Sequence, residues 1–161
     1  MKRVALTVGL TIGFVAGLAL AVVPARADST IYLRVSPATG STTNAVELLL
    51  PDGAYCPLEA DHVIVRLSGG NLSEPLNVTA NTATRALDTM SMPGTAILPL
   101  LWTLRDTGGK VSPAPVLLDG DFRLTLTCLQ GLSQSSLGDV VADLRIDSKA
   151  GTYKVVSPQP A

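Results

Sequence analysis

Apolar and polar residues alternate along most of the apolar runs that follow residue 30. In the first run, Ile31, Leu33 and Val35 fall on one side, and Tyr32 and Arg34 fall on the other. Successive side chains of a strand point to opposite faces of a sheet, so this alternation predicts a half-buried β-strand. Comparable runs bounded by turn residues predict further strands at 46–50, 62–67, 96–105, 120–128, 140–146 and 152–156.

Residues 71–95 carry a weaker pattern. Within them, 76–79 fits a short strand, and 85–92 fits a strand or a single helical turn. Pro99 lies inside the strong run at 96–105 and has no N–H to donate to a ladder, which places that part at a sheet edge or a bulge. No run after residue 30 keeps a helical period over 10 or more residues, so no helix longer than two turns is expected.

About seven strands with turn signals between them predict an all-β chain that folds as one antiparallel β-sandwich. The sandwich is expected to span residues 28–156, followed by a short Pro-containing tail at 157–161. The inward-facing positions predict the core, which comprises Val35, Val46, Leu48, Val63, Val65, Leu100, Trp102, Phe122, Leu124, Leu126 and Leu144.

The start of the chain has the order of a secretory signal peptide. Two basic residues precede an apolar run at 4–23, and Pro24 then precedes the small residues of the Ala-Arg-Ala sequence at 25–27. A retained membrane anchor is the alternative, because about 20 apolar residues can span a bilayer. No cluster of Lys or Arg closes the run, and this favours cleavage before Asp28 and a secreted, extracellular protein.

Cys56 and Cys128 are the two cysteines of the chain. In an oxidising compartment, an even pair this far apart predicts one disulfide. A redox or metal role is the alternative, and it is disfavoured because the pair lacks CxxC spacing and a nearby histidine.

The exported part of the chain is mildly acidic. Three of the 12 Lys and Arg residues lie in the leader, so nine remain against 13 Asp and Glu residues, for a net charge of −4. This balance argues against nucleic acid and anionic lipid as partners, and no contact with the membrane is expected after cleavage.

The polar residues predict no catalytic, cofactor or metal site. His62 is the single histidine, so a Ser-His or Cys-His mechanism would have to use it. It lies beside Asp61 at a strand start, where we expect a solvent-facing side chain. A calcium site at Asp119 and Asp121, which flank Gly120, is the alternative to an ordinary turn, which also favours Asp and Gly.

Other polar and aromatic residues have a structural interpretation and a functional one. Asp139, Asp143 and Asp147 are expected on a solvated strand face rather than in an acidic site. Trp102, the only tryptophan, is expected in the core, and a binding-face position is the alternative. The sequences at Asn71 and Asn77 match the glycosylation pattern and are interpreted as chance matches in a polar loop.

Several segments resemble the immunoglobulin-like domains of secreted actinobacterial proteins. Residues 120–128 resemble the penultimate strand of those domains, and residues 33–40 are similar to their opening segment. The Cys-Pro pair at 56–57 and the Gly-Thr-Tyr sequence at 151–153 match their Cys-Pro pair and closing Gly-x-Tyr piece. The resemblance implies an immunoglobulin-like sandwich with one disulfide, and surface display or binding rather than catalysis.

We therefore expect a secreted, non-catalytic module that binds an extracellular protein or glycan, with contacts from loops 52–62, 69–95 and 106–119. The alternative is a small-molecule carrier similar to the neocarzinostatin-type apoproteins, which share a Ser-Pro-x-x-Gly opening but carry two disulfides. A deep apolar cleft would favour the carrier, and a closed sandwich would favour the module.

We predict that the exported protein begins at Asp28, because signal peptidase cleaves after small residues. N-terminal sequencing and intact mass of the protein recovered from culture medium measure this directly. A product found only in membranes and still carrying Met1 would contradict the prediction.

Overall fold

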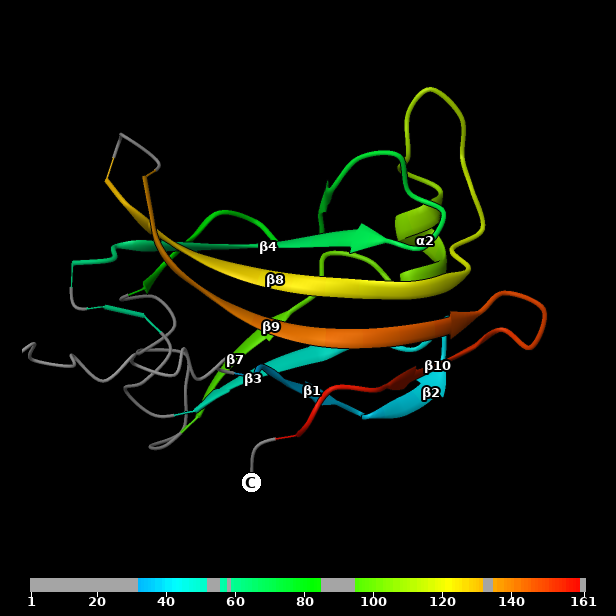
Figure 1. Ribbon diagram of the computed structural model, residues 1–161, viewed down its shortest axis with the longest axis horizontal. Helices are drawn as coiled ribbons and strands as arrows, with labels where there is room; N and C mark the ends of the chain where they lie inside the picture. Colours follow the sequence, from blue (N-terminus) through cyan, green and yellow to red (C-terminus); the bar gives the residue numbers. More distant parts are fainter. Residues whose placement is uncertain (1–31, 52–55, 58, 85–94, 132–134, 160–161) are drawn as a thin grey trace, which may run out of the picture.

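The computed structural model describes residues 32–51, 56–57, 59–84, 95–131 and 135–159, which form ten strands and one short helix (Figure 1). The elements are β1 (Arg34–Ser36), β2 (Thr39–Ser41), β3 (Glu47–Pro51), β4 (His62–Gly69), β5 (Leu76–Asn77), β6 (Thr82–Ala83), β7 (Thr95–Pro99), α2 (Leu104–Gly108), β8 (Gly120–Gln130), β9 (Ser135–Asp147) and β10 (Thr152–Val155). The predicted all-β fold is confirmed, and the helix has five residues.

The strands form two antiparallel sheets. The larger, seven-stranded sheet has the order β2-β10-β9-β8-β4-β5, with β6 also paired to β4. The smaller sheet has the order β1-β3-β7 and lies against the larger one (Figure 1). The long strands β8 and β9 form the centre of the larger sheet, because β8 pairs with β4 on one side and with β9 on the other.

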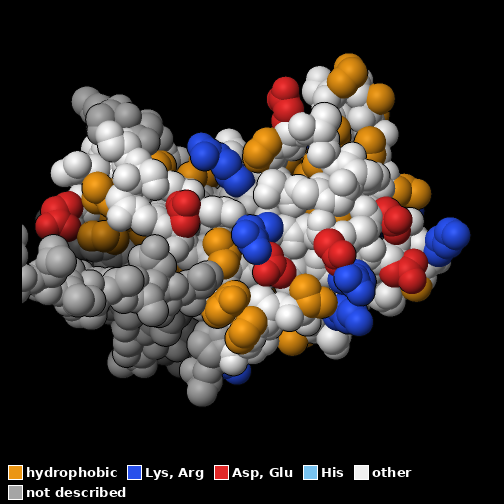
Figure 2. Space-filling model, viewed as in Figure 1, with side chains coloured by type: hydrophobic (Ala, Val, Ile, Leu, Met, Phe, Trp, Pro, Cys, Tyr) orange, Lys and Arg blue, Asp and Glu red, His pale blue; other side chains and the backbone are white. Residues whose placement is uncertain are grey.

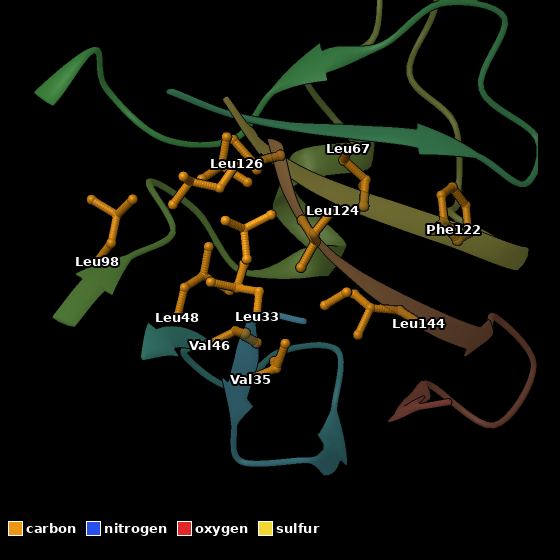
Figure 3. Packing of buried hydrophobic residues seen from close by; sticks show 14 of the residues in the cluster. Leu33, Val35, Val46, Leu48, Leu67, Leu98, Phe122, Leu124, Leu126 and Leu144 are labelled. Atoms are coloured by element: carbon orange, nitrogen blue, oxygen red, sulfur yellow. The ribbon is translucent and has the colours of Figure 1, made fainter. Parts of the chain in front are cut away.

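The core lies between the two sheets, where Val35 of β1 and Leu48 of β3 face Leu124 and Leu126 of β8 and Leu144 of β9 (Figure 3). Nine of the eleven predicted core residues are no more than 2 % exposed: Val35, Val46, Leu48, Val63, Val65, Phe122, Leu124, Leu126 and Leu144. The period-two alternation therefore identified the inward faces of both sheets.

The prediction that Trp102 belongs to the core is wrong, because its side chain is 37 % exposed. Leu100 is only partly buried against the core. The run at 96–105 is not one strand: β7 ends at Pro99, and the chain then turns into α2. Leu104, the first residue of that helix, is fully buried and takes the inward position.

Other expectations for individual strands have mixed outcomes. β7 is an edge strand of the smaller sheet, as predicted from Pro99. The strand predicted at 76–79 is limited to β5, and the segment at 85–92 lies outside the described residues. The leader lies outside them too, and within the described ranges no helix is long and apolar enough to cross a membrane.

The predicted disulfide is confirmed. Cys56 and Cys128 are bonded, with their Cα atoms 5.6 Å apart. Cys128 is fully buried in β8, directly opposite Val63 of β4. The bond therefore ties the segment that precedes β4 to the central strand of the larger sheet.

The two ends of the described chain both lie along β9. The Leu33 N–H donates to the Val141 carbonyl oxygen over 2.7 Å, and the Val156 N–H donates to that of Asp143 over 2.8 Å. The Val35 N–H, on the free edge of β1, donates to Gln159 Oε1 over 2.9 Å. These bonds satisfy backbone groups that an open strand edge would otherwise present to other chains.

We predict that the double substitution Cys56→Ser, Cys128→Ser lowers the free energy of unfolding by up to about 4 kcal/mol. The bond closes a 72-residue separation, and removing it restores the loop entropy of the unfolded chain. Chemical denaturation followed by circular dichroism measures the change. The sheet signal should persist in the folded variant, and a variant as stable as the wild type would contradict the prediction.

Candidate functional site

His62 takes part in a bond network at the start of β4. Its Nδ1 atom lies 2.8 Å from Asp61 Oδ1, and the Gly131 N–H donates to the same oxygen over 2.8 Å. The bond to His62 has the largest effect on the Asp61 carboxylate, and together with the bond from Gly131 it holds the pKa of Asp61 below its usual range. Asp61 therefore joins the start of β4 to the turn after β8, and the partly exposed imidazole of His62 is bonded to the same carboxylate.

The two carboxylates that flank Gly120 bind different partners. Asp119 Oδ1 accepts from the Ser148 N–H over 2.9 Å, and Asp121 Oδ1 lies 2.6 Å from Arg145 Nε. The pKa of Asp119 is lowered by its bonds from Ser148, and that of Asp121 by its bond from Arg145. Among the described residues, no group of three or more His, Cys, Asp or Glu side chains is arranged to hold a metal ion.

The three later aspartates lie in β9, on its solvated side, as predicted. Asp143 Oδ1 lies 2.7 Å from Arg123 Nε, and Asp147 Oδ1 accepts from two backbone N–H groups of the following turn. Asp139 is exposed. Acidic and basic side chains consequently lie beside one another on the face of the larger sheet seen in Figure 2.

Both asparagines of the glycosylation-like sequences form hydrogen bonds within the fold. Asn71 Nδ2 donates to the Leu117 carbonyl oxygen over 2.7 Å, and Asn71 Oδ1 accepts from the Asp119 N–H over 3.1 Å. Asn77 Oδ1 accepts from Arg66 Nε over 3.3 Å. Asn71 thus fixes the end of the loop that connects α2 to β8.

The strongest candidate site is a hollow between α2 and the loop that connects α2 to β8. This loop rises above one end of the sandwich (Figure 1). The hollow has a volume of about 570 Å³ and is open to solvent. Trp102, Pro115 and Leu117 supply its apolar lining, and Leu117 is 67 % exposed. A tryptophan beside exposed aliphatic side chains is the composition of a recognition surface.

Two cations line the same hollow. Lys110 Nζ lies 5.3 Å from the centroid of the Trp102 ring, within the range of a cation–π interaction. Arg105 projects from α2. Within the described part of the chain neither cation has a salt bridge, whereas Arg123 and Arg145 are each paired with an aspartate.

A second hollow of about 410 Å³ lies next to the first. Arg105 and Leu117 line both, so the two hollows are adjacent at the same end of the sandwich. The second hollow is lined by hydroxyl-bearing residues at 41–43 and at Ser148, and by apolar residues that include Leu104, Leu118 and Ile146. We call the two hollows together the end groove.

The shape of the end groove depends on a close backbone contact. The Val116 N–H donates to the Gly108 carbonyl oxygen over 3.0 Å, so the loop packs directly on the last turn of α2. A Cβ atom at Gly108 would collide with the carbonyl oxygen of Val116. Glycine at this position therefore allows the loop to form one wall of the groove.

The sequence contains a signal for α2 that the strand pattern obscured. Thr103 Oγ1 accepts from the Asp106 N–H over 3.1 Å and donates to Asp106 Oδ2 over 2.9 Å. A Thr followed three residues later by an acidic residue is typical of a helix N-terminus. That spacing identifies Thr103 as the residue at which a helix begins, so the inward and outward alternation of a strand cannot be extended to Trp102 to give the direction of its side chain.

Comparisons of the chain with protein-family models, with curated proteins and with solved structures found no match.

We predict that Gly108→Ala lowers the free energy of unfolding by about 1 to 3 kcal/mol, because the added methyl group must push the loop away from α2. Thermal unfolding measures the loss, and the fluorescence of Trp102 reports the change in the groove. Gly109→Ala is the matched control, since its added Cβ would lie 3.1 Å from the Asp106 carbonyl oxygen, a milder contact. Equal stability of Gly108→Ala and the wild type would contradict the prediction.

Proposed function

We propose that the protein is a secreted, non-catalytic module that binds a protein or a glycan outside the cell through the end groove. The observation that carries the proposal is the exposure of Trp102 in an open hollow that it shares with apolar side chains and two cations. Aromatic and arginine side chains contribute most of the binding energy at many recognition surfaces. The groove also involves the predicted contact loop 106–119.

The order of the strands supports an immunoglobulin-like fold. In that fold the first, second and fifth strands share one sheet, and the third, sixth and seventh share the other. β1, β3 and β7 correspond to the first set, and β4, β8 and β9 correspond to the second. β2 and β10 then extend the edge beside β9. This order agrees with the resemblance to the actinobacterial domains.

Export is supported by two features. The leader at 1–27 has the order of a signal peptide, and the Cys56–Cys128 disulfide fits an oxidising compartment. A rigid, crosslinked sandwich that presents loops at one end is well suited to recognition, because binding residues commonly lie on loops held by a stiff scaffold.

A non-catalytic role is supported by what the most reactive side chains do. His62 is bonded to Asp61, Asp121 is bonded to Arg145, and neither His62 nor Asp121 lines the end groove. The carrier alternative calls for a pocket that encloses most of a small ligand. The hollow beside Trp102 is open, and this favours the binding module.

We predict that Trp102→Ala weakens binding to the isolated cell-envelope material of the producing organism by about tenfold or more, as loss of a central aromatic residue does. Co-sedimentation of the purified protein with that material measures the effect. The melting temperature should stay close to that of the wild type, because Trp102 is not part of the core.

Ile97→Ala is the matched control, since Ile97 is 36 % exposed, lies on β7 and does not line the groove. It should bind like the wild type. Wild-type binding by Trp102→Ala, or a hydrolytic activity of the purified protein that His62→Ala abolishes, would overturn the proposal.

A further inference from the structure

The first hollow of the end groove contains more basic than acidic side chains. The exported chain as a whole carries an excess of acidic residues, and Arg123 and Arg145 of the larger sheet are each paired with an aspartate, whereas Arg66 of β4 has no salt bridge within the described ranges. In the groove, Arg105 and Lys110 face one carboxylate, that of Asp106, which accepts a hydrogen bond from Thr103. Two cations and one carboxylate therefore line the first hollow, and the remaining positive charge is complementary to an anion.

The lining changes in character along the groove. At one end lies the indole ring of Trp102, whose apolar face suits the C–H face of a sugar ring. At the other end lie Ser148 and the Ser41–Thr43 pair, whose hydroxyl oxygens are bonded to each other over 2.8 Å and retain further capacity to donate or accept hydrogen bonds. Arg105 lies in the lining that both ends share. A linear ligand with repeated hydroxyl and carboxylate groups matches this sequence of surfaces.

The position of the groove in the fold disfavours an extended peptide. A peptide strand binds by extending a sheet along a free edge, where backbone groups stand in a row. The described lining residues come instead from α2, from the loop after it and from the turns at 41–43 and 148–151. The groove crosses the ends of strands and offers mainly side chains to a ligand.

Resting on the proposed function, we infer that the ligand of the end groove is an acidic polysaccharide whose sugar rings carry carboxylates. One sugar ring packs against the part of Trp102 that Lys110 leaves exposed, its carboxylate contacts the Arg105 and Lys110 side chains, and the next sugar reaches the second hollow. Charge-assisted hydrogen bonds from Arg105 to the carboxylate supply specificity.

The test uses polygalacturonate oligomers as the probe and titration calorimetry of the exported protein at low salt. The fully methyl-esterified oligomer is the matched ligand, since it keeps the sugar backbone and removes the charges. The acidic oligomer should bind, and the ester should bind about tenfold more weakly. Added salt should weaken binding of the acidic oligomer, because the attraction is screened.

The double variant Arg105→Gln, Lys110→Gln should bind the acidic oligomer about tenfold more weakly at an unchanged melting temperature. Lys154→Gln, which removes an exposed cation from β10 outside the groove, should bind like the wild type. Absence of binding, equal binding of acid and ester, wild-type affinity of the double variant, or tighter binding of polyglutamate would each overturn the inference.

The outcomes separate this inference from the proposed function. If Trp102→Ala loses binding to envelope material and the double variant keeps it, the groove is the binding site and the ligand is not an acidic polysaccharide. If Trp102→Ala keeps that binding, the proposed function itself fails.

Discussion

Burial of the apolar face of the larger sheet is the constraint on which the other features depend. Leu124 and Leu126 of β8 and Leu144 of β9 are fully buried, and the smaller sheet covers them with Val35 and Leu48. Each such side chain contributes roughly 1.5 to 3 kcal/mol when it is removed from water. The disulfide adds a covalent link between the central strand and the segment before β4.

The end groove follows from the way in which one end of that core is closed. The smaller sheet has three strands and the larger one has seven, so additional elements must cover the apolar side chains at the edge. Leu104 of α2 and Leu118 of the loop belong to the buried cluster and perform this role. Because Leu104 points inward, the chain carries Trp102 outward, where it lines the groove. Closure of the core and exposure of Trp102 are therefore two consequences of one helix.

The two kinds of charged surface differ in a way that bears on function. On β8 and β9, Arg123 is directly opposite Asp143, and Arg145 is directly opposite Asp121. These cross-strand pairs neutralise one another and favour the observed register. Arg105 and Lys110 lie outside the ladder, line the first hollow together with Asp106, and form no salt bridge among the described residues.

Most of the sheet architecture could be predicted from the sequence, because alternation along β4, β8 and β9 depends only on which face is buried. Trp102 could not be placed in this way. Leu98 and Leu104 are both buried, and a strand would put Trp102 on the same face, whereas the helix start at Thr103 reverses its direction. The second hollow also escaped prediction, since it combines residues 41–43, Leu117 and Ser148, which only the tertiary fold brings together.

The exposure of Trp102 in the end groove is tested most directly by fluorescence, because Trp102 is the only tryptophan of the chain. An indole in the open groove should emit at long wavelength in the folded protein and be quenched readily by acrylamide. Bound ligand should shift the emission to shorter wavelength and protect the ring from the quencher. A short-wavelength emission that acrylamide quenches only after unfolding would place Trp102 in the core and contradict the account.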